Sequence, residues 1–167
     1  MPTLGILTSS DLGAQGQRLD TSGQRIKDML ASAGFQLCRY EVVPDEQTTI
    51  EDRLRCWVDK DDLDLIITTG GTGLTSRDVT PEATRAVAHR EVPGMAEAMR
   101  IKTLKHTPLA MVSRSVVGVR ARTLIINLPG STKAVQECLD IVMPAIPHAL
   151  EMLRACPSAH SAHESYG

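Results

Sequence analysis

Thr68-Thr69-Gly70-Gly71-Thr72-Gly73, followed by Arg77-Asp78-Val79-Thr80-Pro81, is the stretch that decides the fold of this chain. The strand predicted before it, over residues 63–69, is apolar on both faces, which is typical of a strand buried in a parallel sheet. Three glycines then form a turn, Thr80 is placed to cap a helix, and Pro81 is placed at its first position. Such a unit presents backbone N–H groups at a helix N-terminus, which suits a phosphate or another anion.

The composition fits one ordinary globular domain. The chain has 167 residues, of which 42% are hydrophobic and 23% charged, enough for a core of its own. Aromatic residues make up only 2%, so few rings are available to stack on bases. With a net charge of −2 and no basic stripe, neither a nucleic acid nor an anionic membrane is expected as a partner.

Cysteine spacing and the N-terminus favour a reducing compartment. The four cysteines, Cys38, Cys56, Cys138 and Cys156, form no C-x-x-C pair and no zinc pattern. The chain starts without a basic n-region and a long apolar h-region, and no apolar run approaches 18 residues. We therefore expect reduced thiols and a cytoplasmic location.

Strands and helices are predicted to alternate along the chain. Strands are expected over 3–9, 35–43, 63–69, 109–112, 115–119 and 123–128, with a polar loop over 10–20. Helices are expected over 21–33, from the turn at 44–45 to about 59, over 81–89 and 95–105, and after Ser131, restarting near Pro144 and Pro147. Thr21 and Gln24 have the spacing of a capping box.

This alternation predicts an α/β fold with a mostly parallel central sheet between two layers of helices, a three-layer α/β/α sandwich. We expect a single domain over residues 1–154 and a disordered tail over 155–167, which carries His160 and His163. Because ligands bind at the carboxyl ends of parallel strands, the loops at 9–20, 44–48, 69–80 and 127–133 should meet at one edge.

Two carboxylates fall on that edge. Asp45 and Asp78 each follow a predicted strand. Either one alone is more often a turn former or a helix cap. Together, beside a phosphate site, they could hold Mg²⁺ or orient a nucleophile.

The other candidate features have structural explanations of equal weight. The GGTG turn could be only a tight connection, and it matches neither the Walker A loop nor G-x-G-x-x-G. In the stretch Asn127–Lys133, Ser131 could cap a helix or contact an anion, and Lys133 could be a solvated charge. No histidine has metal-ligand spacing. The residues alone thus predict an α/β domain that binds a phosphorylated small molecule.

Many ordered motifs over residues 3–153 make the chain resemble the molybdopterin adenylyltransferase family of molybdenum-cofactor biosynthesis, which includes the equivalent domain of gephyrin-like proteins. The matching motifs are Ser10-Asp11, Asp20-Thr21-Ser22-Gly23, Val43-Pro44-Asp45, Thr68–Gly73, Arg77–Ala83, Val92-Pro93-Gly94, Glu97-Ala98-Met99-Arg100, Ser113-Arg114, Gly118-Val119-Arg120, Asn127–Gly130, Lys133-Ala134-Val135 and Pro144–Leu150. One departure is Thr132, where the family commonly has proline.

The resemblance implies a three-layer domain, assembled as a trimer, that transfers an adenylyl group from ATP to the terminal phosphate of molybdopterin and releases pyrophosphate. It implies that Asp45 and Asp78 are catalytic and hold Mg²⁺, and that the product passes to a metal-insertion enzyme. The residues implied to contact substrate are Ser10, Asp11, Asp20, Ser22, Gly23, Thr69, Gly70, Gly71, Thr72, Gly73, Ser113, Asn127, Pro129, Gly130, Ser131 and Lys133.

Two rival interpretations stay open from the sequence. A paralogue with this fold could bind molybdopterin, or act as a trimeric scaffold, without adenylating it. Two other enzyme families share the glycine loop. The metal-insertion enzyme of the pathway has a related domain within a much longer chain, and the competence-damage-inducible family lacks the Asn-Leu-Pro-Gly turn at 127–130.

Overall fold

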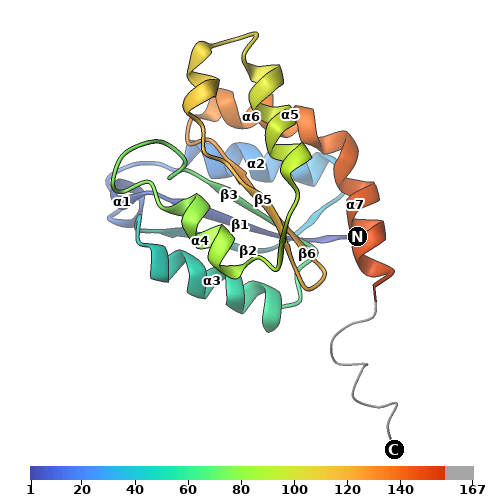
Figure 1. Cartoon of the computed structure of the whole chain (residues 1–167). Helices are drawn as coiled ribbons and strands as arrows, with labels where there is room; N and C mark the ends of the chain where they lie inside the picture. The colour runs from blue at the N-terminus through green and yellow to red at the C-terminus, as the bar shows by residue number, and fades with distance from the viewer. Residues whose placement is uncertain (157–167) are drawn as a thin grey trace, which may run out of the picture.

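A computed structural model describes residues 1–156, which form one six-stranded sheet with helices on both faces (Figure 1). The strands are β1 (Thr3–Ser9), β2 (Gln36–Val43), β3 (Leu65–Thr69), β4 (Arg90–Glu91), β5 (Val117–Arg120) and β6 (Thr123–Leu128). Their order is β2-β1-β3-β6-β5-β4, with β2, β1, β3 and β6 parallel and the β6-β5 and β5-β4 pairs antiparallel. The predicted α/β fold with a mostly parallel sheet is confirmed.

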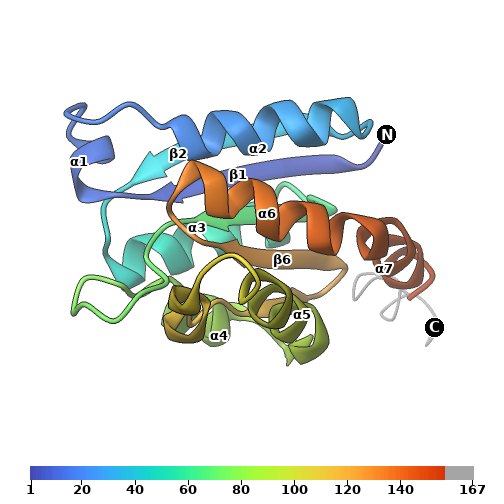
Figure 2. The same ribbon diagram turned by 90° about the horizontal axis from the view of Figure 1, so that it is seen from above.

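Helices cover the two faces of the sheet unequally. They are α1 (Asp11–Ala14), α2 (Thr21–Ser32), α3 (Gln47–Asp59), α4 (Thr80–Val87), α5 (Pro93–Thr103), α6 (Thr132–Val142) and α7 (Ile146–Arg154), with short 3₁₀ turns η1 (Pro108–Val112) and η2 (Met143–Ala145). The larger core joins the sheet to α2, α5, α6 and α7, and the smaller core joins it to α3 and α4. Figure 2 shows α2 and α6 side by side over one face, with α3 on the other side of the sheet.

The central strands have the continuous burial that their sequences predict. Every residue of β3 and β6 is buried. Because side chains alternate along a strand, Leu65 and Ile67 enter the larger core and Ile66 enters the smaller one. The parallel strands end together near α1, so the loops that follow them meet at one edge, as predicted (Figure 1).

Strand β2 forms one edge of the sheet and carries a bulge. Leu4 pairs with Leu37 while Gly5 pairs with Arg39, so Cys38 is an extra residue on β2. An extra residue of this kind bends the strand and increases its twist. Most side chains of β2 are exposed or half-buried.

Several boundaries differ from the sequence expectations. Residues 109–112 form η1 rather than a strand, because Pro108 fixes the turn and the Thr107 hydroxyl accepts from the Leu109 N–H. The loop over 10–20 contains α1, whose N-terminus the Ser10 hydroxyl caps. The strand expected over 115–119 starts at Val117, and the two-residue β4 was not predicted.

Two predicted helix caps were wrong. Asp20 rather than Thr21 caps α2, because its Oδ1 accepts from the Gly23 N–H at 2.9 Å. Thr80 is the first residue of α4 rather than its cap, and its buried hydroxyl has no hydrogen-bond partner in the described part of the chain. The glycine turn therefore precedes α4 by a loop instead of opening it directly.

The tail expectation falls mainly outside the structure's coverage. Helix α7 ends at Arg154, and His160 and His163 lie outside the described residues. Within 1–156, no helix has the length and apolar character needed to cross a membrane. The four cysteines, all within the described range, are free thiols.

Candidate active site

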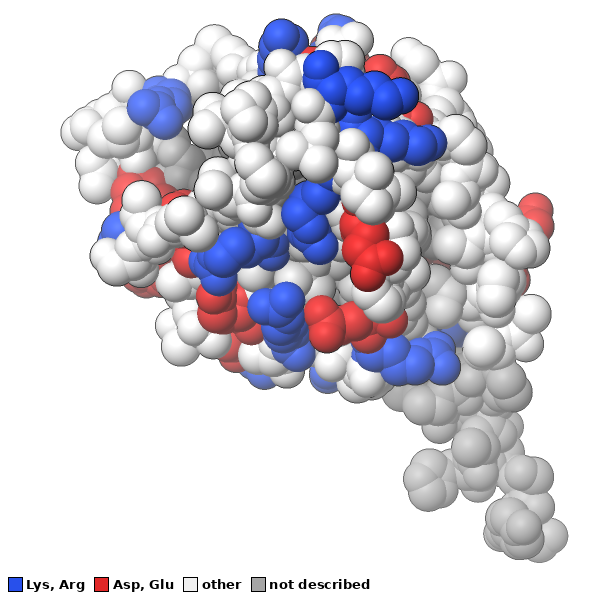
Figure 3. Space-filling view, turned by 45° about the horizontal axis from the view of Figure 1, so that its top comes forward, with Lys and Arg blue, Asp and Glu red and all other residues white. Residues whose placement is uncertain are grey.

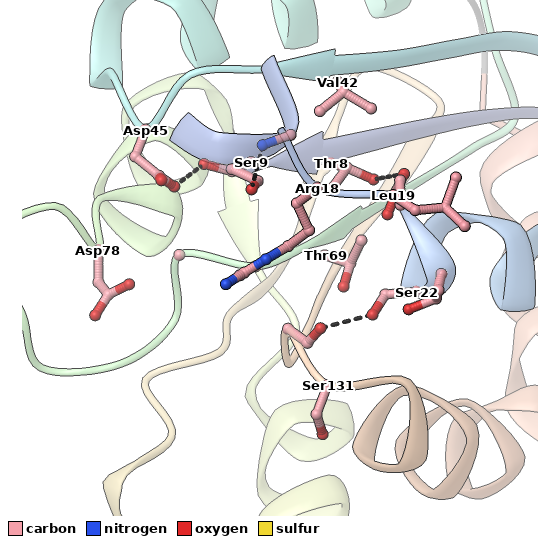
Figure 4. Close-up of a pocket in the computed structure, with 17 residues that line it drawn as sticks. Thr8, Ser9, Arg18, Leu19, Ser22, Val42, Asp45, Thr69, Asp78 and Ser131 are labelled. Atoms are coloured by element: carbon pink, nitrogen blue, oxygen red, sulfur yellow. Dashed lines mark hydrogen bonds between the residues drawn. The ribbon is translucent and has the colours of Figure 1, made fainter. Parts of the chain in front are cut away.

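A cavity of about 450 Å³ lies at the carboxyl ends of the parallel strands (Figure 4). It is formed by the loops after β1, β2, β3 and β6, which are the loops that the sequence places at this edge. Its lining is Thr8, Ser9, Ser10, Gly13, Arg18, Leu19, Asp20, Thr21, Ser22, Val42, Asp45, Thr69, Gly70, Gly71, Asp78, Gly130 and Ser131.

Asp45 is held from two directions. The Ser9 hydroxyl donates to its Oδ1 at 2.5 Å, and the Asp11 N–H donates to its Oδ2 at 2.9 Å. The Asp45 N–H in turn donates to Asp11 Oδ1 at 2.9 Å. Hydrogen bonds to an ionised carboxylate are stronger than neutral ones, so the Asp45 side chain is fixed before any ligand arrives.

Asp78 lies across the cavity from Ser22 and Ser131 (Figure 4). The N–H and the hydroxyl of Thr75 donate to its Oδ2 at 2.9 and 2.8 Å. No described residue donates to its Oδ1, which leaves that oxygen for a ligand. The structure thus brings the two predicted carboxylates to one cavity.

The glycine turn adopts a backbone that other residues resist. Gly70 and Gly71 have φ of +88° and +67°. A Cβ on Gly70 would lie 2.3 Å from the Ser9 carbonyl oxygen, and one on Gly71 would lie 2.4 Å from Thr80 Oγ1. Glycine is therefore required at both positions for conformation and for space.

The glycine turn is also tied to the loop that follows β6. The Thr69 hydroxyl donates to the Pro129 carbonyl at 2.6 Å, and the Gly70 N–H donates to the Leu128 carbonyl at 3.3 Å. The Ser22 hydroxyl donates to the Gly130 carbonyl at 2.6 Å. These hydrogen bonds join the glycine turn, the loop after β6 and the start of α2 around one cavity.

Arg114 fixes the loop between the glycine turn and α4. Its guanidinium donates to the carbonyls of Gly73 and Asp78, both at 2.7 Å, and to the Glu82 carboxylate. This ion pair lowers the pKa of Glu82. Arg114 lies outside the cavity lining, so it positions the loop that carries Asp78.

Arg77 and Asp11 form a second brace. The Arg77 guanidinium binds Asp11 through two N–H groups, at 3.0 and 2.8 Å. This side-chain hydrogen bonding lowers the pKa of Asp11 and raises that of Arg77. Because Asp11 also binds Asp45, the brace links the loop after β3 to the loop after β2.

Both carboxylate oxygens of Asp20 accept hydrogen bonds from other residues of the protein. Its Oδ1 caps α2, and its Oδ2 accepts from the Thr8 hydroxyl at 2.6 Å and from the Tyr40 hydroxyl. Burial, together with the bond to Asp20, raises the pKa of the Tyr40 phenol. Asp20 therefore anchors α2 to β1 and β2 beside the cavity.

The predicted site residues divide into two groups. Those that line the cavity are Ser10, Asp20, Ser22, Asp45, Thr69, Gly70, Gly71, Asp78, Gly130 and Ser131. Those that do not are Asp11, Gly23, Thr72, Gly73, Ser113, Asn127, Pro129 and Lys133.

Asn127 and Lys133 lie furthest from the expected role. Asn127 is fully buried; its amide nitrogen donates to Thr68 and Thr84 hydroxyls, and its Oδ1 accepts from the Val116 N–H. The Lys133 side chain is 84% exposed and lies 3.9 Å from Glu137. In this structure Asn127 joins β6 to its neighbours, and Lys133 faces solvent.

Thr21 also lines the cavity and belongs to the Asp20–Gly23 stretch that the resemblance places at the site. Sequence analysis missed six lining residues: Thr8, Ser9, Gly13, Arg18, Leu19 and Val42. Thr8, Ser9 and Val42 could have been found, because the last residues of β1 and β2 must flank a site at the strand ends. Arg18 and Leu19 belong to the loop before α2, where no periodic pattern indicates which side chains turn inward.

The donor set fits a magnesium ion in part. Within residues 1–156, no three His, Cys, Asp or Glu side chains gather as a complete metal site. Two carboxylates in one cavity nevertheless match the way proteins hold Mg²⁺, with one or two carboxylates and with phosphate oxygens and water completing the shell. Of the two carboxylates, only that of Asp78 has an oxygen, Oδ1, that accepts no hydrogen bond from the described residues.

Comparison with known proteins places the chain in a family. A family model described as a probable molybdopterin binding domain matches residues 5–148. The chain belongs to this family. A molybdopterin adenylyltransferase from Helicobacter pylori is 42% identical over 152 residues, which cover 90% of this chain and 86% of that protein. One from Escherichia coli K12 is 42% identical over 145 residues, covering 85% and 74%.

Solved structures of other molybdopterin-binding domains agree with the fold. The molybdopterin biosynthesis enzyme MoaB from Thermus thermophilus superposes with a TM-score of 0.88 at 52% identity, covering 95% of this chain and 99% of that one. The α/β domain described above is therefore the fold of this family of molybdopterin-binding domains.

Side chains of opposite charge lie close together on part of the surface outside the cavity. On the face drawn in Figure 3, acidic and basic side chains lie next to one another over the lower part. The ion pairs Arg85–Glu91, Arg114–Glu82 and Arg120–Asp59 are examples of this mixture.

Proposed function

We propose that this cavity catalyses adenylyl transfer from ATP to the terminal phosphate of molybdopterin in molybdenum-cofactor biosynthesis. An oxygen of the molybdopterin phosphate forms a bond to the α-phosphorus of ATP. The bond from that phosphorus to the bridging oxygen breaks, and pyrophosphate leaves with the electron pair. The relatives named molybdopterin adenylyltransferase, which match most of the chain, support this reaction.

The observation that carries the proposal is the pairing of Asp45 and Asp78 in one cavity with the glycine turn. Transfer of a phosphoryl-type group depends on positioning and on neutralising phosphate charge rather than on covalent chemistry by the protein. Asp45, held by Ser9 and Asp11, is a rigid carboxylate suited to alignment. The backbone of the glycine turn and the hydroxyls of Ser10 and Ser131 suit phosphate oxygens.

A magnesium ion is part of this proposal. Asp45 and Asp78 would hold it, with the remaining ligands coming from substrate phosphates and water. When bound, it supplies positive charge against the phosphate oxygens. The protein's own part is to fix both carboxylates, through Ser9, Asp11 and Thr75, at the edge where the phosphates enter.

We also propose that the chain forms a homotrimer in the cytoplasm and passes its product to a metal-insertion enzyme. Large apolar side chains near α5 and η1 support self-association, since exposed apolar clusters mark interfaces. Their exposed fractions are 66% for Ile101, 43% for Leu104, 70% for Leu109, 69% for Met111 and 45% for Val112. Light scattering after size exclusion measures the assembly directly.

Mass spectrometry tests the reaction. Purified protein is incubated with molybdopterin, ATP and Mg²⁺, and adenylated molybdopterin and pyrophosphate are quantified. Product that disappears on chelation of the metal supports the adenylyltransferase and its metal. Tight binding of molybdopterin without product, under every nucleotide and metal condition, would instead support a non-catalytic binding module.

A further inference from the structure

Arg18 is the single positively charged residue in the described lining of the cavity. It belongs to the segment between α1 and α2. Figure 4 shows its side chain reaching across the opening, with the guanidinium toward the middle of the cavity on the side of Asp78. Three carboxylates share that lining: Asp20, Asp45 and Asp78.

The neighbouring cations are already engaged. Arg77 binds Asp11 through two N–H groups, and Arg114 binds the loop carbonyls and Glu82. The Lys133 side chain points to solvent beside Glu137. Over residues 1–156, Arg18 makes neither a hydrogen bond to protein nor an ion pair. Arg18 is therefore the one basic side chain in the described cavity lining, and its N–H groups have no acceptor among residues 1–156.

Two of the three carboxylates in the lining, Asp20 and Asp45, have both oxygens engaged by other donors, whereas Asp78 is held through Oδ2 alone and forms no ion pair with Arg18 in the described part of the chain. Both oxygens of Asp20 accept from Thr8, Tyr40 and the Gly23 N–H. Both oxygens of Asp45 accept from Ser9 and the Asp11 N–H. The guanidinium therefore faces the space where ligand phosphates would lie, and its planar fork matches two phosphate oxygens at once.

We propose that Arg18 binds a phosphate group of the reacting substrates and stabilises the charge on its oxygens in the transition state. This rests on the proposed function of the cavity. Arg18 transfers no proton. It donates N–H hydrogen bonds, as the backbone of the glycine turn also can, and it adds a positive charge that neither the glycine turn nor the carboxylates carry. The phosphate belongs either to ATP or to molybdopterin, and steady-state kinetics separate the two.

The experiment compares Arg18→Ala, Arg18→Lys and Arg53→Ala with the wild type. Arg53 is the control, because it is an exposed arginine paired with Glu41 outside the cavity. Loss of one stabilising donor typically costs about 10²–10³ in rate, so we expect Arg18→Ala to lower kcat/KM about 100-fold. Arg18→Lys should recover part of the rate, because lysine keeps the charge without the fork.

The kinetic constants identify the phosphate. A rise in KM for ATP alone assigns the contact to the nucleotide, and a rise for molybdopterin alone assigns it to the pterin substrate. A fall in kcat indicates a contact that strengthens in the transition state. Millimolar guanidinium chloride should restore part of the activity of Arg18→Ala, whereas sodium chloride at equal ionic strength should not.

Three outcomes would overturn the inference. They are an Arg18→Ala variant within three-fold of wild type for both substrates, an equal loss in Arg53→Ala, and a loss with lowered Tm and no guanidinium rescue. If wild-type protein forms no product at all, the proposed function fails by itself. Calorimetry with inorganic tripolyphosphate then decides the role of Arg18, and equal Kd values for wild type and Arg18→Ala reject it.

Discussion

Asp11 and Asp45 hold each other through their backbones: the N–H of each donates to the carboxylate of the other, both at 2.9 Å. The two residues follow different strands, and Arg77 grips Asp11 from a third loop. Asp11 does not line the cavity, but it fixes the position of Asp45, which does. Asp11 is in this sense a positioning residue for Asp45.

Replacing Asp11 should therefore lower kcat more than it weakens substrate binding. In Asp11→Ala the Asp45 N–H loses its acceptor, and Arg77 loses its partner. We expect kcat to fall about tenfold, since small misplacement of a reacting group is costly, with KM changed less than threefold. Asp61→Ala is the matched control, because it removes a similar two-point pair with Arg39 far from the cavity. Equal kcat in the two variants would contradict the positioning role.

Asp45→Asn and Asp78→Asn should each lower turnover by at least about 100-fold while leaving the fold and the assembly intact. Asp78→Asn keeps an oxygen that Thr75 can still bind, so its Tm should stay near that of wild type. Asp140→Asn, an exposed change on α6, provides the control for loss of a charge. Product formation by mass spectrometry is the measurement. Normal turnover in both active-site variants would reject the catalytic assignment.

Gly71→Ala should destabilise the protein by about 2–4 kcal/mol, because a left-handed backbone and a close contact with Thr80 are both imposed on the new Cβ. Urea unfolding followed by circular dichroism gives the free energy of unfolding. Gly34→Ala separates the two causes, since Gly34 has φ of +87° but open space around it. We expect about 1–2 kcal/mol there.

The double variant Gly71→Ala/Thr80→Ala tests the contact itself. The Thr80 hydroxyl has no partner among the described residues, so its removal sacrifices no hydrogen bond. Part of the Gly71→Ala loss should return in the double variant. Strictly additive losses would show that the contact with Thr80 is unimportant.

The buried Cys138 predicts a weakness at alkaline pH. Burial raises the pKa of this thiol to about 11 from an ordinary value of 9.0. The folded state thus favours the neutral thiol, so its contribution to stability is complete below pH 9 and is lost as the pH rises toward 11. We expect the free energy of unfolding to fall by about 2 kcal/mol over that interval.

The control for this pH effect is Cys138→Ala, which should show a shallower decline over the same interval. The pKa of Tyr40 is also raised, and Tyr40 contributes equally to the pH dependence of the free energy of unfolding in both proteins. Thiol labelling at pH 8 gives a second measurement: exposed Cys38 and Cys156 should react well before Cys138. Equal pH profiles for the variant and wild type would contradict the assignment.

The parts of the fold that the sequence predicted are those with strong local signals. The all-apolar run before Gly70 predicted β3, and the rule that parallel strands end together predicted that Asp45 and Asp78 would meet. By contrast, the apolar residues at 109–112 were predicted to form a strand, because a run of this length is too short for its periodicity to distinguish a strand from a helical turn. Pro108 and the Thr107 hydroxyl decided for a 3₁₀ turn instead.

The site was predictable in its carboxylates and glycines but not in its supports. Arg114 and Arg77 lie in motifs that match the family, but the sequence does not indicate their acceptors, which only the path of the folded chain brings to them. The resemblance implied that Asn127 contacts substrate, but Asn127 lies within β6 and does not line the cavity. Here the neighbouring Thr68 and Thr84 occupy its amide instead.

The bulge at Cys38 affects whether copies of this chain associate through the edge strand β2 at high concentration. An eight-residue edge strand such as β2 offers unpaired backbone groups to any passing strand. The added twist at the bulge, with the charges of Arg39 and Glu41, disfavours pairing with a second copy. The same edge strand that leads to Asp45 is thus protected from aggregation without a covering helix.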